Sequence, residues 1–487
     1  MEAETLILGA GPAGLACAME LSRADRKSII VEKDELIGGL AKTLEFWEGD
    51  DLFRTDIGPH RFFSKNRYLY DFIEDLLDEE WRKVPRCTRQ YIDGKFYDYP
   101  VNAMQVFKNI GPFKAARILF DYGLARIRYR FLGKRLETFE DYVVANFGRT
   151  LAEFSMINYT EKIWGIPAAT IHPDWARQRI SGLNFLSLLK NTFNLKKKIG
   201  KAKKGGGPKS LVDEFYYPQY GTGRIYEEIG KRLEERGNEI HRGTQPVKIK
   251  HNGTKVTEVI CEKDGEQFSI KPEFVVESIP ITQVLKLLDP PPPQEVFDAA
   301  NSLKWRAQVY LFLTLDKDQV TKDNWIYFPN KSIPFGRTSE MKNFSADMAP
   351  EGKTSFFIEF FAFEGDEIWQ MDKDQLLDLV MPYFEDFGFF TRDDVRNHYV
   401  MRRGQVYPVY DMTYTSHLDT IKGWLDKLEN LIYLGRPGRF KYTNQDHSLE
   451  MGIVSSRMII EGRKYDLDPI GSENEYFESG PVYEKRL

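Results

Sequence analysis

The chain has 487 residues, 42% of them hydrophobic, which is enough for a large core shared by several domains or lobes. Its 68 basic and 73 acidic residues leave a formal net charge of −5, so nothing suggests nucleic acid as a partner. Three cysteines without paired spacing and seven scattered histidines predict neither a disulfide framework nor a metal site, and suit a reducing cytoplasm. No apolar run approaches the roughly 18 residues of a membrane span, and the chain enters a strand at once, so we expect no signal peptide.

A glycine-rich turn follows the first predicted strand. Residues 6–8 form a short apolar run typical of a buried strand, and Gly9, Gly11 and Gly14 follow it with the spacing G-x-G-x-x-G. The first glycine permits a tight turn, the second lets a pyrophosphate approach the backbone, and the third lets helix and strand pack closely. A helix predicted over 13–23 would offer its free N–H groups to the phosphates. The turn therefore predicts a dinucleotide site.

An acid and a second pair of glycines come next. A second buried strand is predicted over 28–31 and ends at Glu32, where a carboxylate can accept hydrogen bonds from ribose hydroxyls. Gly38 and Gly39 follow, and then a loop over 56–61 that reads Asp-Ile-Gly-Pro-His-Arg. A fold that binds only a nicotinamide cofactor needs neither, although the glycine pair alone would also suit an ordinary loop turn.

Glu32 followed by a glycine pair resembles the flavoprotein superfamily of amine oxidases, protoporphyrinogen oxidase, phytoene desaturase and UDP-galactopyranose mutase. The resemblance implies FAD as cofactor, with the glycine pair near its pyrophosphate and the later Gly-x-His loop against the isoalloxazine ring. Amine oxidases often link the flavin to a C-terminal cysteine, but none follows Cys261 here, so noncovalent binding is expected. The candidate FAD contacts in this part of the chain are Gly9, Gly11, Pro12, Ala13, Gly14, Glu32, Lys33, Gly38, Gly39, Leu40, Gly58, Pro59 and His60.

Helix and hairpin patterns follow. Residues 68–81 are amphipathic with an acidic outer face, which predicts a helix. Asp93-Gly94 between the aromatic runs of 91–100 predicts a tight β-hairpin. Residues 112–133 predict a helix with one bulky apolar face and basic residues elsewhere, namely Lys114, Arg117, Arg126, Arg128 and Arg130. That helix can lie on an anionic membrane surface, or it can be a domain helix with a solvated basic face, the interpretation we favour.

Two further stretches carry lysine. Tyr159, Lys162 and Trp164 stand close together and resemble the K-x-W-G stretch of the mutase-like and protoporphyrinogen-oxidase-like members. They could hold an anionic substrate, or they could equally be a core tryptophan with a surface lysine. Residues 190–209 contain eight lysines and no acids, which favours a mobile surface loop over a lid or an arm attracted to a phosphate-bearing or membrane-bound substrate.

The middle of the chain returns to a nucleotide-binding pattern. A Tyr-Pro-x-x-Gly turn before a helix predicted over 225–235 resembles the segment where the superfamily re-enters its FAD domain. By that resemblance Val247 is a candidate adenine contact. Residues 274–280 predict a buried strand that ends at a proline, and four prolines at 290–293 predict a boundary.

Strands and turns alternate over 300–410, which predicts an antiparallel sheet. Arginines and tyrosines that project from such a sheet could bind phosphates or sugar hydroxyls, because a guanidinium matches phosphate oxygens bidentately. Arg337 and Tyr407 are the residues chosen from this region.

The last informative stretch is a buried strand from 431, a glycine-rich turn and a helix that ends at Glu461. It resembles the G-R-x-G segment of the mutase branch, in which the helix N-terminus faces the ribityl chain and the O2/N1 edge of the flavin. The candidate FAD contacts implied by this resemblance are Gly435, Arg436, Asn444, Gln445, Asp446 and Ser448.

Together these patterns predict an α/β protein with a discontinuous Rossmann-type FAD-binding domain and an inserted α+β substrate domain that contains helices and an antiparallel sheet. The FAD domain is expected over 1–64, 210–285 and 425–465, the substrate domain over 65–209 and 286–424, and a tail over 466–487.

The function expected first is an FAD-dependent oxidoreductase that transfers hydride at flavin N5 to or from an anionic small molecule, which could be a nucleotide sugar or lipid-linked. The candidate catalytic residues are His60, Arg61, Arg337 and Tyr407. The alternative is a sugar-nucleotide mutase in which reduced flavin acts as a nucleophile. Arg61 stands where the mutases carry a second histidine, which weakens that alternative, and a scaffold without catalysis is disfavoured. A cytoplasmic enzyme is expected, with basic segments that offer peripheral membrane contact.

Overall fold

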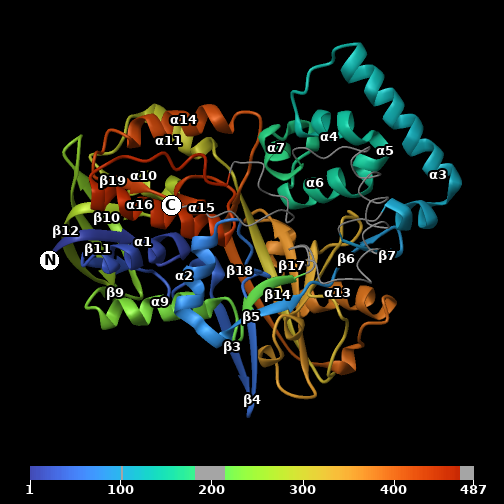
Figure 1. Cartoon of the computed structure of the whole chain (residues 1–487), viewed down its shortest axis with the longest axis horizontal. Helices are drawn as coiled ribbons and strands as arrows, with labels where there is room; N and C mark the ends of the chain where they lie inside the picture. Colours follow the sequence, from blue (N-terminus) through green and yellow to red (C-terminus); the bar gives the residue numbers. More distant parts are fainter. Residues whose placement is uncertain (100–102, 181–213, 472–487) are drawn as a thin grey trace, which may run out of the picture.

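Two β-sheets organise the molecule (Figure 1). The computed structural model describes residues 1–99, 103–180 and 214–471, so the lysine-rich stretch 190–209 and the tail from residue 472 lie outside the described residues. The N-terminal strand lies in the first sheet, and the helical segment 103–180 lies at the opposite side of the molecule.

The first sheet has eight strands in the order β13-β10-β11-β12-β1-β2-β9, with β19 paired to β12 outside this path. Its centre is parallel, because β12 pairs with β1 and with β19, β1 with β2, and β2 with β9. The β2 strand and the end of β1 are buried on both faces, as expected for a parallel sheet covered by helices. The bounds are β1 (Glu2–Leu8), β2 (Ser28–Val31), β9 (Glu239–His241), β10 (Thr244–His251), β11 (Val256–Lys263), β12 (Glu266–Glu277), β13 (Leu288–Asp289) and β19 (Leu431–Tyr433).

Helices cover both faces of this sheet. They are α1 (Pro12–Arg23), α2 (Arg67–Leu77), α9 (Gly223–Glu235), α10 (Ile281–Leu287), α11 (Gln294–Ser302), α14 (Tyr414–Leu425), α15 (Gly435–Gly438) and α16 (Gln445–Glu461). Helices α1 and α16 approach each other closely: a Cβ at Gly452 would lie 2.2 Å from the carbonyl oxygen of Ala13. Glycine is needed here because the two helix backbones are nearly in contact.

The second sheet has seven strands in the order β18-β14-β17-β16-β15-β6-β7, all antiparallel except for the β15–β6 pair. One face packs on α13 (Lys373–Asp386) through a cluster of phenylalanines. The bounds are β6 (Thr88–Ile92), β7 (Lys95–Asp98), β14 (Trp305–Leu315), β15 (Trp325–Tyr327), β16 (Arg337–Glu340), β17 (Thr354–Ala362) and β18 (Val395–Pro408). Two small sheets, β3 (Thr43–Glu48) with β4 (Asp51–Asp56) and β5 (Trp81–Pro85) with β8 (Glu214–Pro218), lie between the large ones.

A helical segment extends from the second sheet at the upper right of Figure 1. Its long helix α3 (Ala103–Arg126) is kinked at Gly111 and continues into a π-helical turn, η3 (Ile127–Phe131). The remaining elements are α4 (Phe139–Phe147), α5 (Arg149–Leu151), α6 (Asn158–Trp164) and α7 (Asp174–Ile180).

The helix predicted over 68–81 is shorter than expected. It ends at Leu77, and Trp81 instead begins strand β5, where its ring stacks on Tyr216 of β8. The aromatic partner lies 135 residues away in sequence, so local periodicity could not reveal it. The hairpin turn at Asp93-Gly94 is confirmed, since both residues have positive φ, of 49° and 79°.

None of the helices within the described residues combines the length and the apolar character needed to cross a bilayer. In the same residues, histidine, cysteine and carboxylate side chains form no group suited to a metal ion.

Gly452→Ala should destabilise the protein, because the added methyl group meets backbone atoms of α1 that cannot move aside. We expect a loss of about 1–3 kcal/mol in the free energy of unfolding, measured by urea denaturation. Gly423→Ala is the matched control, since a Cβ there has no neighbour within 4 Å and lies on helix α14. That change should be stabilising by up to about 1 kcal/mol. Equal effects of the two changes would contradict the close contact.

Candidate functional site

The turn between β1 and α1 is shaped by its three glycines. A Cβ at Gly9 would lie 2.7 Å from Ser278 Oγ, and one at Gly14 would lie 2.3 Å from the Gly9 carbonyl oxygen. A Cβ at Gly11, in contrast, would meet nothing within 4 Å. No side chain caps the N-terminus of α1, so its first N–H groups face this open space. The turn thus leaves room for an anion beside free backbone donors.

The second glycine pair lies directly against this turn. Gly38 N–H donates to the Ala10 carbonyl at 2.8 Å, and a Cβ at Gly39 would lie 3.1 Å from the Gly11 Cα atom. Both glycines have positive φ, of 102° and 57°. The pair is therefore a second wall of the same space rather than a turn elsewhere on the surface.

The Glu32 carboxylate is buried at the end of β2. Its Oε2 accepts from the Ala10 amide at 2.8 Å and its Oε1 from the Asp34 amide at 3.0 Å. Each oxygen keeps a lone pair for a further donor such as a ribose hydroxyl. Its carbonyl accepts from the Thr244 amide at 2.8 Å, which brings β10 alongside, and Val247 lies at an irregularity in the β10–β11 register.

The C-terminal turn closes over the same place. A Cβ at Gly435 would lie 3.2 Å from Ala13 Cβ, so α15 sits against the start of α1. Gln445 at the start of α16 donates to the His60 carbonyl at 3.2 Å and accepts from the Tyr226 hydroxyl at 3.0 Å. The two turns that the sequence assigned to one cofactor therefore meet. Asn444 caps α16, and Ser448 Oγ lies 3.1 Å from Thr443 Oγ1.

His60 is held as a neutral imidazole. Its Nε2 lies 2.9 Å from the carbonyl oxygens of both Leu40 and Ile57, so Nε2 carries the proton and Nδ1 remains an acceptor. Burial, together with the positive charges of Arg436 and Arg337, lowers the pKa of His60 to about 4. At neutral pH the His60 imidazole is therefore uncharged. It can accept a hydrogen bond at Nδ1, but it is a weak base.

Asp56, which the sequence did not single out, anchors the loop that carries His60. Its carboxylate accepts from Thr43 Oγ1 at 2.6 Å, from the Tyr217 hydroxyl at 2.6 Å and from the Thr222 amide at 3.1 Å. Burial raises its pKa to about 6 despite these donors. Thr222 Oγ1 in turn donates to the His60 carbonyl at 2.9 Å. Three segments thus fix the Gly58–His60 loop.

Arg337 faces the same loop from the second sheet. Its Nη2 donates to Glu359 Oε2 at 2.8 Å, and Nε donates to Oε1, a bidentate pair. Gln308 also donates to Glu359, at 3.1 Å. Burial opposes the charge on Arg337, but the Glu359 carboxylate outweighs it and raises the pKa of the guanidinium. A Cβ at Gly58 would lie 3.9 Å from Arg337 Nη2, so the loop and the ion pair are neighbours.

Tyr407 stacks with Tyr442, with ring centroids 5.4 Å apart, and Arg436 lies over both rings at 5.2 and 5.0 Å. Burial raises the pKa of Tyr407. Arg436 Nε donates to the Thr443 carbonyl at 2.9 Å, which ties the α15 turn to the start of α16.

Arginine and aromatic side chains continue from here as a wall, called the arginine–aromatic wall below. Arg61 lies 5.6 Å and Arg86 5.5 Å from the Trp325 ring, and Arg86 lies 5.4 Å from the Tyr99 ring. Tyr99 contacts Tyr327 at 5.3 Å, and Tyr327 pairs with Arg337 across β15 and β16. The wall consists of Arg61, Arg86, Tyr99, Trp325 and Tyr327, and of these only Arg61 was predicted as catalytic. Trp325 and Tyr327 share one face of a strand, a period-2 signal that could have singled them out.

Some predicted residues lie elsewhere or serve another purpose. The Lys162 ammonium donates to four backbone carbonyls, at 2.6 Å to Phe328, 2.5 Å to Asn330, 2.9 Å to Ile333 and 3.1 Å to Phe335. Lys162 is thus neither a surface lysine nor directed at an anion. Trp164 is fully buried in the core, which agrees with the structural interpretation.

Of the remaining candidates, Lys33 has an exposed side chain. Asp446 is buried beside Arg61; burial raises its pKa, and its Oδ1 has no hydrogen-bond partner within the described residues. Asp446 Oδ1 is therefore able to accept a hydrogen bond from a bound ligand.

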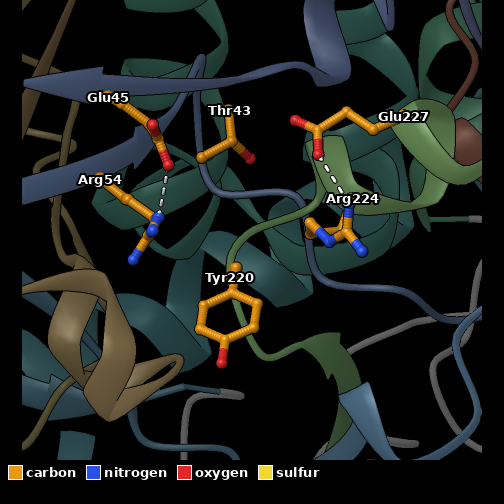
Figure 2. A pocket seen from close by; sticks show the side chains of 6 residues that line it. All are labelled: Thr43, Glu45, Arg54, Tyr220, Arg224 and Glu227. Atoms are coloured by element: carbon orange, nitrogen blue, oxygen red, sulfur yellow. Dashed lines mark hydrogen bonds and ion pairs between the residues drawn. The ribbon is translucent and has the colours of Figure 1, made fainter.

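A separate cavity of about 250 Å³ lies between β3 and the start of α9 (Figure 2). It is lined by Thr43, Glu45, Arg54, Tyr220, Arg224 and Glu227. Arg54 pairs with Glu45 at 2.8 Å and Arg224 with Glu227 at 3.0 Å. Each arginine that lines the cavity is therefore neutralised by a glutamate that also lines it.

Comparisons with known proteins identify the family of this chain. The model of the family "flavin containing amine oxidoreductase" matches residues 12–435. A UDP-galactopyranose mutase from Mycoplasma genitalium is 27% identical over 35% of this chain and 41% of its own length. An L-amino-acid oxidase from Gloydius halys is 21% identical over 68% of this chain and 65% of its own length. The chain thus aligns with less than two thirds of either relative.

Solved structures share the fold over nearly the whole chain. A reduced UDP-galactopyranose mutase superposes with a TM-score of 0.79 at 20% identity, covering 98% of this chain and 97% of the other. A putrescine oxidase bound to putrescine superposes with a TM-score of 0.62 at 12% identity, covering 95% and 99%. Identities this low establish the mixed α/β fold alone. The family match, which spans most of the chain, establishes more: this protein belongs to the family of flavin-containing amine oxidoreductases.

Proposed function

We propose that FAD binds noncovalently where the Gly9–Gly14 turn, the Gly38–Gly39 pair and the 435–448 segment meet. Three observations support this placement: the open space above Gly11, the uncapped start of α1, and the buried Glu32 carboxylate. The three cysteines support noncovalent attachment, because Cys17 and Cys261 are buried and Cys87 lies beside Asp323.

We further propose that the first sheet carries a discontinuous FAD domain over 1–64, 210–285 and 425–465. The second sheet and the helical segment then form the substrate domain over 65–209 and 286–424. The strand composition of the two sheets supports this division, except that β13 extends the first sheet past residue 285.

The proposed substrate is an anionic, phosphate-bearing small molecule. The observation that carries this proposal is the convergence of Arg61, Arg86, Arg337 and Arg436 with aromatic rings beside the His60 loop. Guanidinium groups favour phosphate oxygens, and the rings offer faces to a planar base or sugar. The same charges would repel a cationic amine.

The residues then have distinct tasks. Arg61 and Arg86 hold the anion, and the Trp325 and Tyr327 rings pack against its planar part. Glu359 fixes the orientation of Arg337, and His60 accepts a hydrogen bond at Nδ1 while its Nε2–H is tied to the backbone. Tyr407, with its raised pKa, stays protonated and can donate. FAD supplies a two-electron carrier whose N5 takes a hydride or, when reduced, acts as a nucleophile.

We propose hydride transfer from a substrate C–H bond as the reaction, in keeping with the family. The second candidate is a redox-neutral sugar-nucleotide mutase. The arginine–aromatic wall favours it specifically, because a nucleoside diphosphate presents both a stacking base and two phosphates.

Binding and turnover distinguish these candidates. UDP should perturb the flavin absorption of the loaded enzyme, whereas putrescine should not; the opposite pattern would contradict an anionic substrate. Conversion of UDP-galactopyranose to the furanose by the dithionite-reduced enzyme would identify it as a mutase. Without that conversion, anaerobic bleaching of the oxidised flavin by an anionic donor identifies the oxidoreductase.

Arg61→Met should weaken UDP binding roughly 10- to 100-fold through loss of a charge-assisted contact. Arg392→Met is the control, because that side chain pairs with Asp378 on the exposed surface.

Gly11→Val should abolish retention of FAD. The Cβ atom of the new side chain would enter the open space above the N-terminus of α1 with no protein atom within 4 Å, so folding should persist. The measurement is the flavin-to-protein absorbance ratio after gel filtration, with Gly423→Val on α14 as the loaded control. A fully yellow Gly11→Val protein would show that the turn does not hold the cofactor.

The stability of the protein should depend on His60 at acid pH. Its pKa is about 4 in the folded state against an ordinary value of 6.5, so the unfolded chain takes up the proton first. Stability is therefore lost as pH falls from about 6.5 towards about 4, by at most about 3 kcal/mol.

The difference in free energy of unfolding between wild type and His60→Gln, measured with saturating FAD, should shrink over that range. Taking this difference removes the opposing titration of Asp56. A difference that does not vary with pH would mean that His60 is not held neutral.

A further inference from the structure

A stripe of large apolar side chains faces solvent along the outer side of α3 and η3. Its members, called the apolar stripe, are Phe113, Phe120, Leu124, Ile127 and Phe131, with exposed fractions of 92%, 66%, 49%, 51% and 79%. Their spacing of three, four or seven residues places them on one side of a helix. Leu119 and Leu132 of the same segment are also exposed, at 53% and 77%. Contiguous exposed apolar surface of this kind marks an interaction site.

The inner side of the same helix is already packed. Ile118 and Ala125 are buried, and the Asp121 carboxylate accepts from the Thr150 amide at 3.2 Å. A Cβ at Gly148, between α4 and α5, would lie 2.6 Å from the Tyr122 amide nitrogen, so the backbones are in close contact. Helix α3 therefore cannot rotate to bury the apolar stripe. In Figure 1 it lies along the outer edge of the molecule, away from the first sheet.

Basic residues accompany the apolar stripe along α3 and η3. Residues 112–136 contain seven basic residues and a single acid, Asp121, which points inward. Arg117 and Arg126 lie on α3, and Arg128 and Arg130 stand between the stripe residues Ile127 and Phe131 in η3. Within the described residues Arg126, Arg128, Arg130 and Arg135 have no carboxylate partner, whereas Lys114, Arg117 and Lys134 are paired with Asp93, Asp121 and Asp141.

We propose that this face rests on the surface of an anionic lipid bilayer. The helix would lie parallel to the membrane, with the apolar stripe among the acyl chains near the headgroups and the arginines on lipid phosphates. Charge decides between this occupant and a second copy of the chain. A self-pair would bring the arginine rows of two copies together with no acid between them, which is repulsive.

The inference does not depend on the substrate or on the reaction proposed above. It reverses the interpretation favoured from the sequence, in which the apolar face would be packed within a domain and only the basic face solvated. The structure places the apolar residues themselves in solvent.

Flotation of the FAD-loaded full chain with vesicles tests the proposal. The protein should bind vesicles of phosphatidylcholine with phosphatidylglycerol, should not bind phosphatidylcholine alone, and should be released by high salt. Replacing Phe113, Phe120 and Phe131 together by serine should lower the bound fraction at least about 10-fold, as should replacing Arg126, Arg128 and Arg130 together by serine.

Trp47→Ser is the matched control, since that exposed ring on β3 lies outside α3 and η3 and should not matter. Because all these side chains are at the surface, unchanged thermal unfolding would verify that the variants fold. Three results would overturn the proposal: no binding to anionic vesicles, binding that the stripe variant does not reduce, or a wild-type dimer that the stripe variant converts to monomer in analytical ultracentrifugation.

Discussion

The near-contact of helices α1 and α16 is the constraint on which the candidate site depends. Gly452 brings the two backbones together at Ala13, and Gly435 brings the C-terminal turn against the same residue. These segments are more than 420 residues apart in sequence, yet they enclose one space. The parallel strands β12, β1 and β19 make this possible, because their carboxyl ends meet at one edge of the sheet. Any increase in the distance between α1 and α16 would open the space that these segments enclose.

Charge in the site is balanced unevenly. Arg337 is neutralised by the buried Glu359, while Arg436 lies over the stacked rings of Tyr407 and Tyr442, and His60 remains neutral beside both arginines. The surroundings of the His60 loop are therefore electropositive, although the charge of Arg337 is compensated by Glu359. This electropositive environment supports the proposal of a negatively charged substrate. The Asp56 carboxylate stabilises the Gly58–His60 loop by accepting hydrogen bonds from Thr43, Tyr217 and Thr222.

Sequence was sufficient where function demands fixed local spacing. The glycine turn, Glu32, the glycine pair and the helix that ends at Glu461 could be placed because each is defined by neighbours in the chain. The pairing of Glu359 with Arg337, and the meeting of Arg86 with Trp325, depend on the register of distant strands and carry no local signal. Periodicity also identified an apolar face on residues 112–133, but it could not reveal which side of that helix has a packing partner.

The hydrogen bonds of the Lys162 ammonium group restrict how this part of the molecule can move. Its protons are shared among four carbonyls of the 328–335 turn, so helix α6 and that turn are joined by one side chain. Tyr327 immediately precedes the turn and contacts Tyr159 of the same helix. This part of the arginine–aromatic wall should consequently move as a rigid body with α6, and any hinge that admits substrate would have to lie outside it.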